Sequence, residues 1–79
     1  MPHVNIKLHP GRSMAQKSEL AEKIIKNIAE VLQCKKKVIS VSMEEVSSEE
    51  WFEKVYGPDI EGKQEQLIIK PGYGPLAKK

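Results

Sequence analysis

Apolar and polar residues alternate at the start of the chain, a pattern typical of a strand with one buried face. Period-two alternation with β-branched residues predicts an extended strand, and the apolar members are Val4, Ile6 and Leu8. Pro2 is compatible with this strand, because proline is tolerated at the first position. The His-Pro-Gly sequence at 9–11 predicts a turn. We therefore expect a strand over residues 3–8 that ends in a turn.

The longest amphipathic pattern follows this turn and predicts a helix. Ser13 and Gln16 have the spacing of a capping box, which marks a helix start. Apolar residues then recur at spacings of three and four, as on a helix with a broad buried stripe; they are Leu20, Ala21, Ile24, Ile25, Ile28, Ala29, Val31 and Leu32. We expect this helix to run from about Met14 to about Cys34. It should end at lysines 35–37, because cations suit the negative end of the helix dipole.

A second alternating segment covers residues 38–43. One face would carry Ile39, Val41 and Met43, and the other Val38, Ser40 and Ser42. A strand, a long helix and a strand form a βαβ unit, in which the two strands are parallel and the crossover is right-handed. Two strands do not form a stable sheet alone. We therefore expect an α+β fold in which a second copy of the chain completes a four-stranded sheet.

The remainder of the chain predicts short helices and turns within one domain of residues 1–79. A short helix carrying Trp51, Phe52 and Val55 should begin near residue 47, and the Gly-Pro pair at 57–58 should stop it. A second short helix is expected over 61–69, with Leu67 and Ile68 as its apolar contacts. The Pro-Gly-Tyr-Gly-Pro segment at 71–75 predicts turns, and residues 76–79 predict a frayed tail.

Composition narrows the class of protein. The 79 residues include 13 basic and 11 acidic ones, and this near balance disfavours a nucleic-acid binder. No apolar run is long enough to span a membrane, and the first residues lack the apolar segment of a secretory signal, so we expect a soluble cytoplasmic protein. Cys34 is the only cysteine, and it has no paired spacing with histidines, so we expect no disulfide, metal or cofactor.

Pro2 is the sharpest candidate for chemistry. Because proline is small, removal of Met1 would expose its nitrogen as a secondary amine, which can act as a general base when its pKa lies near the working pH. An apolar wall such as Trp51 and a cation such as Arg12 would both lower the pKa of that amine. A retained Met1 would instead make the nitrogen a tertiary amide, which has no basicity.

The set of features from Pro2 to about Trp51 resembles the oxalocrotonate tautomerase family. It comprises the proline behind Met1, the alternating strand, the Gly-Arg-Ser sequence at 11–13, and the long amphipathic helix that leads to a second strand. Trp51 and residues 67–73 resemble the longer, dimeric branch of this family, whereas its shorter members form hexamers. The resemblance implies a small-molecule isomerase that interconverts enol and keto forms, with no cofactor, as a homodimer rather than a hexamer.

The resemblance also implies roles for individual residues. Pro2 would be the catalytic base and acid, Arg12 would bind a substrate carboxylate, and Trp51 would stand where an aromatic residue makes the pocket apolar. Ser40 falls where the family has an arginine that polarises the carbonyl side of the substrate. A serine donates a hydrogen bond but no charge, so we expect a monocarboxylate such as an arylpyruvate rather than a dicarboxylate.

Other interpretations remain open from the sequence. The same fold without the charge at Ser40 would suit a binding or structural module with little turnover. Trp51 would equally suit a core or interface, and His3 a structural or pocket-rim position. A nucleic-acid-binding domain is disfavoured because no strand carries paired aromatic residues.

Overall fold

The computed structural model describes residues 1–78 of the chain. These residues form two compact units, an N-terminal unit of Met1–Glu45 and a C-terminal unit that begins at Val46. The N-terminal unit holds the strands and the long helix, and the C-terminal unit holds short helical segments.

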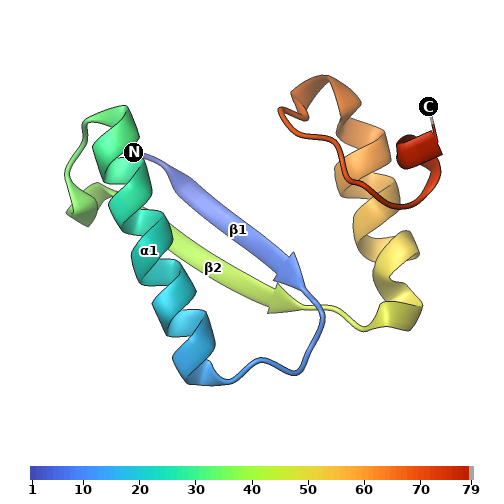
Figure 1. The fold of residues 1–79 in the computed structure, drawn as a ribbon, viewed down its shortest axis with the longest axis horizontal. Helices are drawn as coiled ribbons and strands as arrows, with labels where there is room; N and C mark the ends of the chain where they lie inside the picture. Colours follow the sequence, from blue (N-terminus) through green and yellow to red (C-terminus); the bar gives the residue numbers. More distant parts are fainter. Residues whose placement is uncertain (79) are drawn as a thin grey trace. The chain divides into compact units, whose positions relative to one another are not determined.

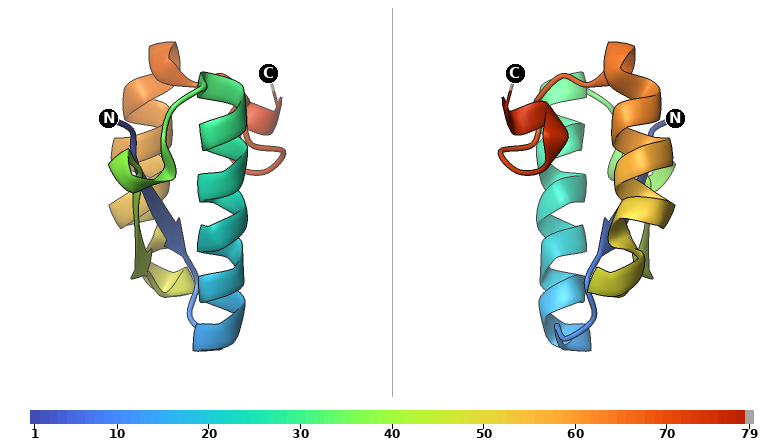
Figure 2. Two further views of the ribbon diagram at one scale, coloured as in Figure 1. Left: turned by 90° about the vertical axis from the view of Figure 1, so that its left-hand side faces the viewer. Right: turned by 90° about the vertical axis from the view of Figure 1, so that its right-hand side faces the viewer.

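The N-terminal unit is the expected βαβ unit. Strand β1 spans His3–Leu8, helix α1 spans Met14–Leu32, and strand β2 spans Ser40–Glu45. The two strands pair in parallel along their full length, from His3 opposite Ser40 to Leu8 opposite Glu45. Helix α1 forms a second layer beside the strand pair (Figures 1 and 2). The predicted α+β class and the parallel pairing within one chain are confirmed.

The capping box at the start of α1 forms as predicted. The Ser13 hydroxyl accepts a hydrogen bond from the Gln16 N–H at 3.1 Å, and the Gln16 side-chain oxygen accepts one from the Ser13 N–H at 3.0 Å. These two bonds satisfy backbone donors that have no partner within the helix. The helix ends at Leu32, two residues before the predicted end, because Gln33 turns to a left-handed conformation with φ of 55°.

Strand β2 begins two residues later than predicted. Residues Lys36–Val38 form a 3₁₀ turn, η1, in which the Ile39 N–H donates to the carbonyl of Lys36 at 3.1 Å. This turn removes Val38 from the strand. The predicted division of faces survives, because Val41 and Met43 are half-buried while Ser40 and Ser42 are exposed. Ile39 is buried and anchors the entry to the strand.

The C-terminal unit contradicts the predicted helix stop at Gly57 and Pro58. After a 3₁₀ turn η2 at Ser48–Glu50, the π-helix η3 runs through both residues from Phe52 to Ile60. In an α-helix, a proline ring clashes with the carbonyl four residues earlier. The wider π-helical turn gives the ring room, because its hydrogen bonds reach five residues back. The Gly-Pro pair, which usually ends an α-helix, therefore does not end η3.

The segments after η3 differ from prediction in two ways. The 3₁₀ helix η4 spans Glu61–Gln66 rather than residues 61–69, and Ile68 makes no apolar contact of the expected kind because it is 95% exposed. The predicted frayed tail is instead folded at Pro75–Lys78, the 3₁₀ helix η5, where Leu76 is buried. Lys79 lies outside the described residues. Burial of Leu76 holds this segment in place, whereas a short terminal segment is usually expected to fray.

Candidate active site

Pro2 lies immediately before β1, and its position is fixed by the strand pair. The carbonyl of Pro2 accepts a hydrogen bond from the Ser40 N–H at 3.2 Å, which extends the ladder between β1 and β2 by one bond. The proline ring is half-buried, whereas Met1 is fully exposed, with a relative accessibility of 102%. The structure therefore holds Pro2 next to the start of β2 and leaves the residue before it open to solvent.

Ser40 is held close to Pro2 by the same pairing, and its side chain contacts His3. The Ser40 hydroxyl lies 2.7 Å from Nδ1 of His3, and the hydroxyl of Ser42 lies 3.5 Å from Nε2 of the same ring. All three side chains are exposed. Sequence reasoning gave His3 a structural or pocket-rim position but missed this hydrogen bond. Only the register of the two strands, which pairs His3 with Ser40, brings the side chains together.

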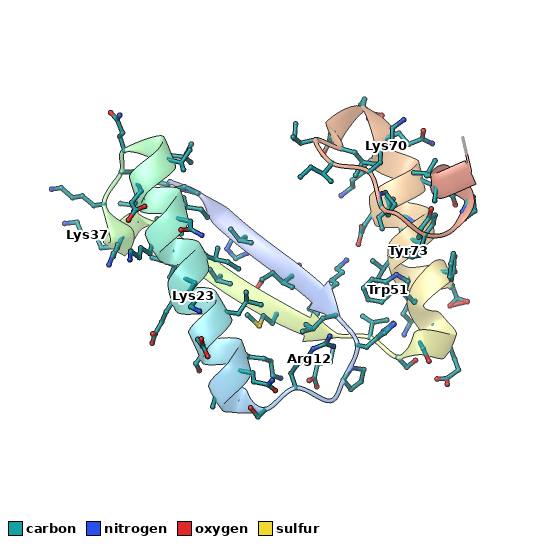
Figure 3. The ribbon with its side chains drawn as sticks, viewed as in Figure 1. Arg12, Lys23, Lys37, Trp51, Lys70 and Tyr73 are labelled. Atoms are coloured by element: carbon teal, nitrogen blue, oxygen red, sulfur yellow. The ribbon has the colours of Figure 1, made fainter. Side chains whose placement is uncertain are left out.

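Arg12 does not approach Pro2 of the same chain. It lies in the loop that follows β1 (Figure 3), and its Nη1 donates to the carbonyl of His9 at 3.3 Å. Pro2 precedes the other end of the same strand, and a strand of this length spans about 20 Å at about 3.3 Å per residue. One N-terminal unit therefore places the predicted base and the predicted carboxylate-binding group at opposite ends of β1.

Trp51 belongs to the C-terminal unit, where it contacts the tail. Its indole N–H donates to the hydroxyl of Tyr73 at 2.8 Å, and Figure 3 shows the two side chains close together. Tyr73 also packs edge-on against Phe52 and Tyr56, with ring centroids 6.4 and 5.3 Å away. The indole is thus part of an aromatic cluster, which fits the interpretation of Trp51 as a packed aromatic residue.

Tyr56 is the residue in this unit that sequence reasoning missed. It is fully buried, and its ring stacks on Phe52 with centroids 4.8 Å apart. Its hydroxyl donates to the carbonyl of Tyr73 and accepts from the N–H of Leu76, each at 3.0 Å. A single tyrosine gives no periodic signal, and the partners of its hydroxyl lie 17 and 20 residues away in the sequence. Such a bridge is invisible until the tail folds back.

Some charged groups of the described residues form ion pairs at the surface. Lys17 bonds Glu45 at 3.0 Å within the N-terminal unit. In the C-terminal unit, the hydrogen bond and charge of Lys54, aided by the hydroxyl of Ser47, hold the pKa of Glu50 below its usual value. Within residues 1–78, no three histidine, cysteine, aspartate or glutamate side chains gather closely enough to hold a metal ion.

One cavity lies between α1 and β2, away from Pro2. It has a volume of about 240 Å³ and is lined by Met14, Lys17, Ser18, Ala21, Val41 and Met43. Its walls belong to the face of the sheet that α1 covers, whereas His3 and Ser40 lie on the other face. The cavity is therefore separate from Pro2, His3 and Ser40.

Among the described helices, none combines the length and the apolar character that a membrane span requires.

A parallel βαβ unit with a proline held at the head of its first strand defines the class to which this chain belongs. Residues 2–57 match the model of the tautomerase enzyme family. The chain therefore belongs to the tautomerase family, whose members are isomerases.

Individual relatives extend the match over almost the whole chain. A protein of Xylella fastidiosa described as "Probable tautomerase" is 43% identical over 77 residues, which cover 98% of this chain and 94% of the relative. Tautomerase PptA of Cronobacter sakazakii is 36% identical over 74 residues, which cover 92% of this chain and 97% of the relative. Tautomerase PptA of an Enterobacter strain is 38% identical over the same length. The predicted family is confirmed, and two of these relatives carry the name PptA.

Proposed function

We propose that this chain is a tautomerase that interconverts the enol and keto forms of a small α-keto acid, with Pro2 as the general base and acid. The nitrogen of Pro2, freed by removal of Met1, takes a proton from a carbon or hydroxyl of the substrate and returns it at the other position. The observation that carries the proposal is the placement of Pro2. Its carbonyl is bonded to Ser40, so the ring is fixed at the strand start, and Met1 is fully exposed to an aminopeptidase.

The proposed site takes residues from two copies of the chain. Pro2 and Arg12 lie at opposite ends of β1, about 20 Å apart by strand length, so one chain does not supply both. An antiparallel pairing of two copies would bring the end of one β1 to the start of the other. The arginine of the partner would then bind the substrate carboxylate and lower the pKa of the proline amine by repulsion between cations.

Burial in the chain supports an assembly of two copies. Among the described residues of α1, none is buried, although the helix carries a continuous apolar stripe. Val31 and Leu32 are 78% and 60% exposed. Apolar surface of this kind is stabilised when a partner removes it from water. We therefore propose a homodimer with a four-stranded sheet. We also propose that residues 1–79 act as one domain, because the family match at residues 2–57 crosses the boundary between the two units.

The substrate class follows from the side chains that we propose to bind the substrate. Ser40 offers one neutral hydrogen bond where a second cation would be needed for a second carboxylate. Trp51 would supply an apolar wall for an aromatic or aliphatic group, since its indole N–H is already bonded to Tyr73. We therefore favour a monocarboxylate enol such as that of an arylpyruvate. Cytoplasmic localisation stays a prediction.

Ketonisation of phenylenolpyruvate tests this proposal. In Pro2→Ala, removal of Met1 leaves a primary amine in place of the rigid ring nitrogen, and we expect the rate to fall by roughly a hundredfold, the lower range for the effect of a positioned general base. The measured mass of the purified chain should equal that of the chain without Met1. A chain with a lysine inserted between Met1 and Pro2 should keep Met1 and be inactive, because the ring nitrogen is then an amide.

The matched control is Pro75→Ala, which changes an exposed proline in the tail. Its rate should equal that of the wild type. If Pro2→Ala and the lysine insertion also turn over at the wild-type rate, the amine has no catalytic role. The chain would then be a binding module on the tautomerase fold, the alternative function that the neutral side chain of Ser40 favours.

A further inference from the structure

We propose that His3 is a positioning residue that fixes the direction of the Ser40 hydrogen bond, so that the Ser40 hydroxyl donates to the oxygen of the substrate. This inference rests on the proposed function, because it concerns the oxygen on which charge develops when Pro2 removes a proton. It assigns a role to a side chain that neither the family match nor the proposed base requires.

The geometry places the imidazole of His3 between two hydroxyls. Nδ1 lies 2.7 Å from Oγ of Ser40, and Nε2 lies 3.5 Å from Oγ of Ser42. The first distance is typical of a good hydrogen bond, and the second is at the outer limit. The parallel register places His3 directly opposite Ser40 and two residues from the partner position of Ser42. The ring is therefore coupled strongly to Ser40 and weakly to Ser42.

A neutral imidazole has one donor and one acceptor nitrogen, so its two hydrogen bonds run in a fixed direction. In one arrangement, Ser42 donates to Nε2, and the Nδ1–H of His3 donates to Oγ of Ser40. The proton of Ser40 is then free for a ligand. In the opposite arrangement, the Ser40 hydroxyl donates its hydrogen bond to Nδ1, and it can then only accept a hydrogen bond from a ligand. A keto, enolate or carboxylate oxygen accepts hydrogen bonds, so only the first arrangement serves the substrate.

The position of Ser40 relative to Pro2 gives this direction its chemical meaning. The Ser40 N–H is bonded to the Pro2 carbonyl at 3.2 Å, so the hydroxyl and the proposed base share one end of the strand pair. When the base removes a proton from carbon, negative charge develops on the substrate oxygen. A hydrogen bond donated to that oxygen is stronger in the transition state than in the ground state, because the oxygen then carries more negative charge. Its loss should therefore lower kcat more than it raises KM.

Steady-state kinetics of four variants test the role of His3. We expect Ser40→Ala and His3→Leu each to lower kcat by about tenfold, the value of one good hydrogen bond, with KM changed by less than about twofold. The double variant should be no slower than either single variant, because the two residues act through one bond. His3→Asn should retain most of the rate, since its amide nitrogen can take the place of Nδ1 as donor.

The matched control is Asn5→Ala, on the same face of β1. Asn5 donates to the Glu44 carboxylate at 3.2 Å, a cross-strand bond like that of His3 but two residues further along. Its loss should leave kcat unchanged. If His3→Leu keeps the wild-type kcat, or if Asn5→Ala lowers it equally, the bond between His3 and Ser40 is structural only and the inference is overturned.

A second measurement does not depend on activity. ¹⁵N NMR of the His3 imidazole distinguishes the two tautomers, and we expect the proton on Nδ1 in the chain without ligand. A proton on Nε2 would overturn the inference even if the variants were slow. If Pro2→Ala and the lysine insertion retain the wild-type rate, the proposed function fails, but the NMR result still reports whether the ring donates to Ser40.

Discussion

Two residues at the start of the chain show how much chemistry depends on neighbours that are distant in sequence. Pro2 and His3 are adjacent, but each contacts Ser40, 37 or more positions away, through a backbone bond and a side-chain bond respectively. The proline thereby gains a fixed position and the histidine gains a partner. Neither contact is encoded in the residue itself, because both follow from the register of β1 and β2.

Gly74 is a second residue whose role depends on a distant side chain. It has φ of +73°, and a Cβ built on it would lie 2.6 Å from Cζ of Tyr56. We therefore predict that Gly74→Ala destabilises the protein by about 1–3 kcal/mol, through overpacking and an unfavourable backbone conformation. Urea denaturation measures this loss as a lower midpoint.

Gly72→Ala is the matched control for this prediction. A Cβ at Gly72 would meet nothing within 4 Å. Its effect on the free energy of unfolding should stay within about 0.5 kcal/mol, as for an ordinary surface change. Equal destabilisation by the two substitutions would mean that the tail does not pack on Tyr56 as described.

At the scale of elements, α1 and η3 respond differently to their sequences. Helix α1 begins where its capping box predicts and ends within two residues of the expected position, because local backbone donors and the left-handed Gln33 decide both ends. Helix η3 continues through Gly57 and Pro58, because its wider turn accommodates them. Rules derived from α-helices therefore apply to the first element and fail for the second.

The start of η3 carries a pH-dependent contribution to stability. Lys54 lies 3.0 Å from Glu50, and its hydrogen bond and charge lower the pKa of that carboxyl. A group whose pKa is lowered by folding stabilises the folded state above its unfolded pKa and loses this contribution as the pH falls through the lowered value. The contribution is small, because both side chains are exposed to solvent.

We therefore predict that Glu50→Gln lowers the urea midpoint slightly at neutral pH and progressively less at acidic pH, as the pH falls through the lowered pKa of the wild-type carboxyl. Urea titrations at both pH values measure the difference. Glu53→Gln removes a charge from the first turn of η3, three residues further along, and serves as the control. A Glu50→Gln effect that is equal at both pH values would contradict the role of ionisation.

At the scale of the whole molecule, the proposed dimer makes a prediction that a single chain does not. Pro2→Ala and Arg12→Ala should each lose most of the activity alone, the former by roughly a hundredfold. After unfolding and refolding together in equal amounts, half of the dimers should be mixed, and each mixed dimer should contain one site with both native residues. Activity should return to roughly a quarter of the wild-type value, because isologous contacts give two equivalent sites per dimer.

Mixing the two variants without unfolding provides the control for this complementation, and it should restore activity only as fast as subunits exchange. Sedimentation of the refolded mixture measures its oligomeric state. If the mixture stays inactive although it is dimeric, Pro2 and Arg12 of one chain serve the same site, and the proposed division of the site between two copies is wrong.

The sequence alone determined the βαβ unit, its parallel pairing and the family, because alternation, a capping box and a periodic apolar stripe are local patterns that specify local structure. It also identified Pro2 as the candidate base, since the chemistry of an N-terminal proline depends on its position in the chain. Only the tertiary structure decided that His3 bonds Ser40, that Tyr56 holds the tail, and that Arg12 lies a strand's length from Pro2. These facts depend on strand register and chain reversal, which bring together side chains that no local pattern relates.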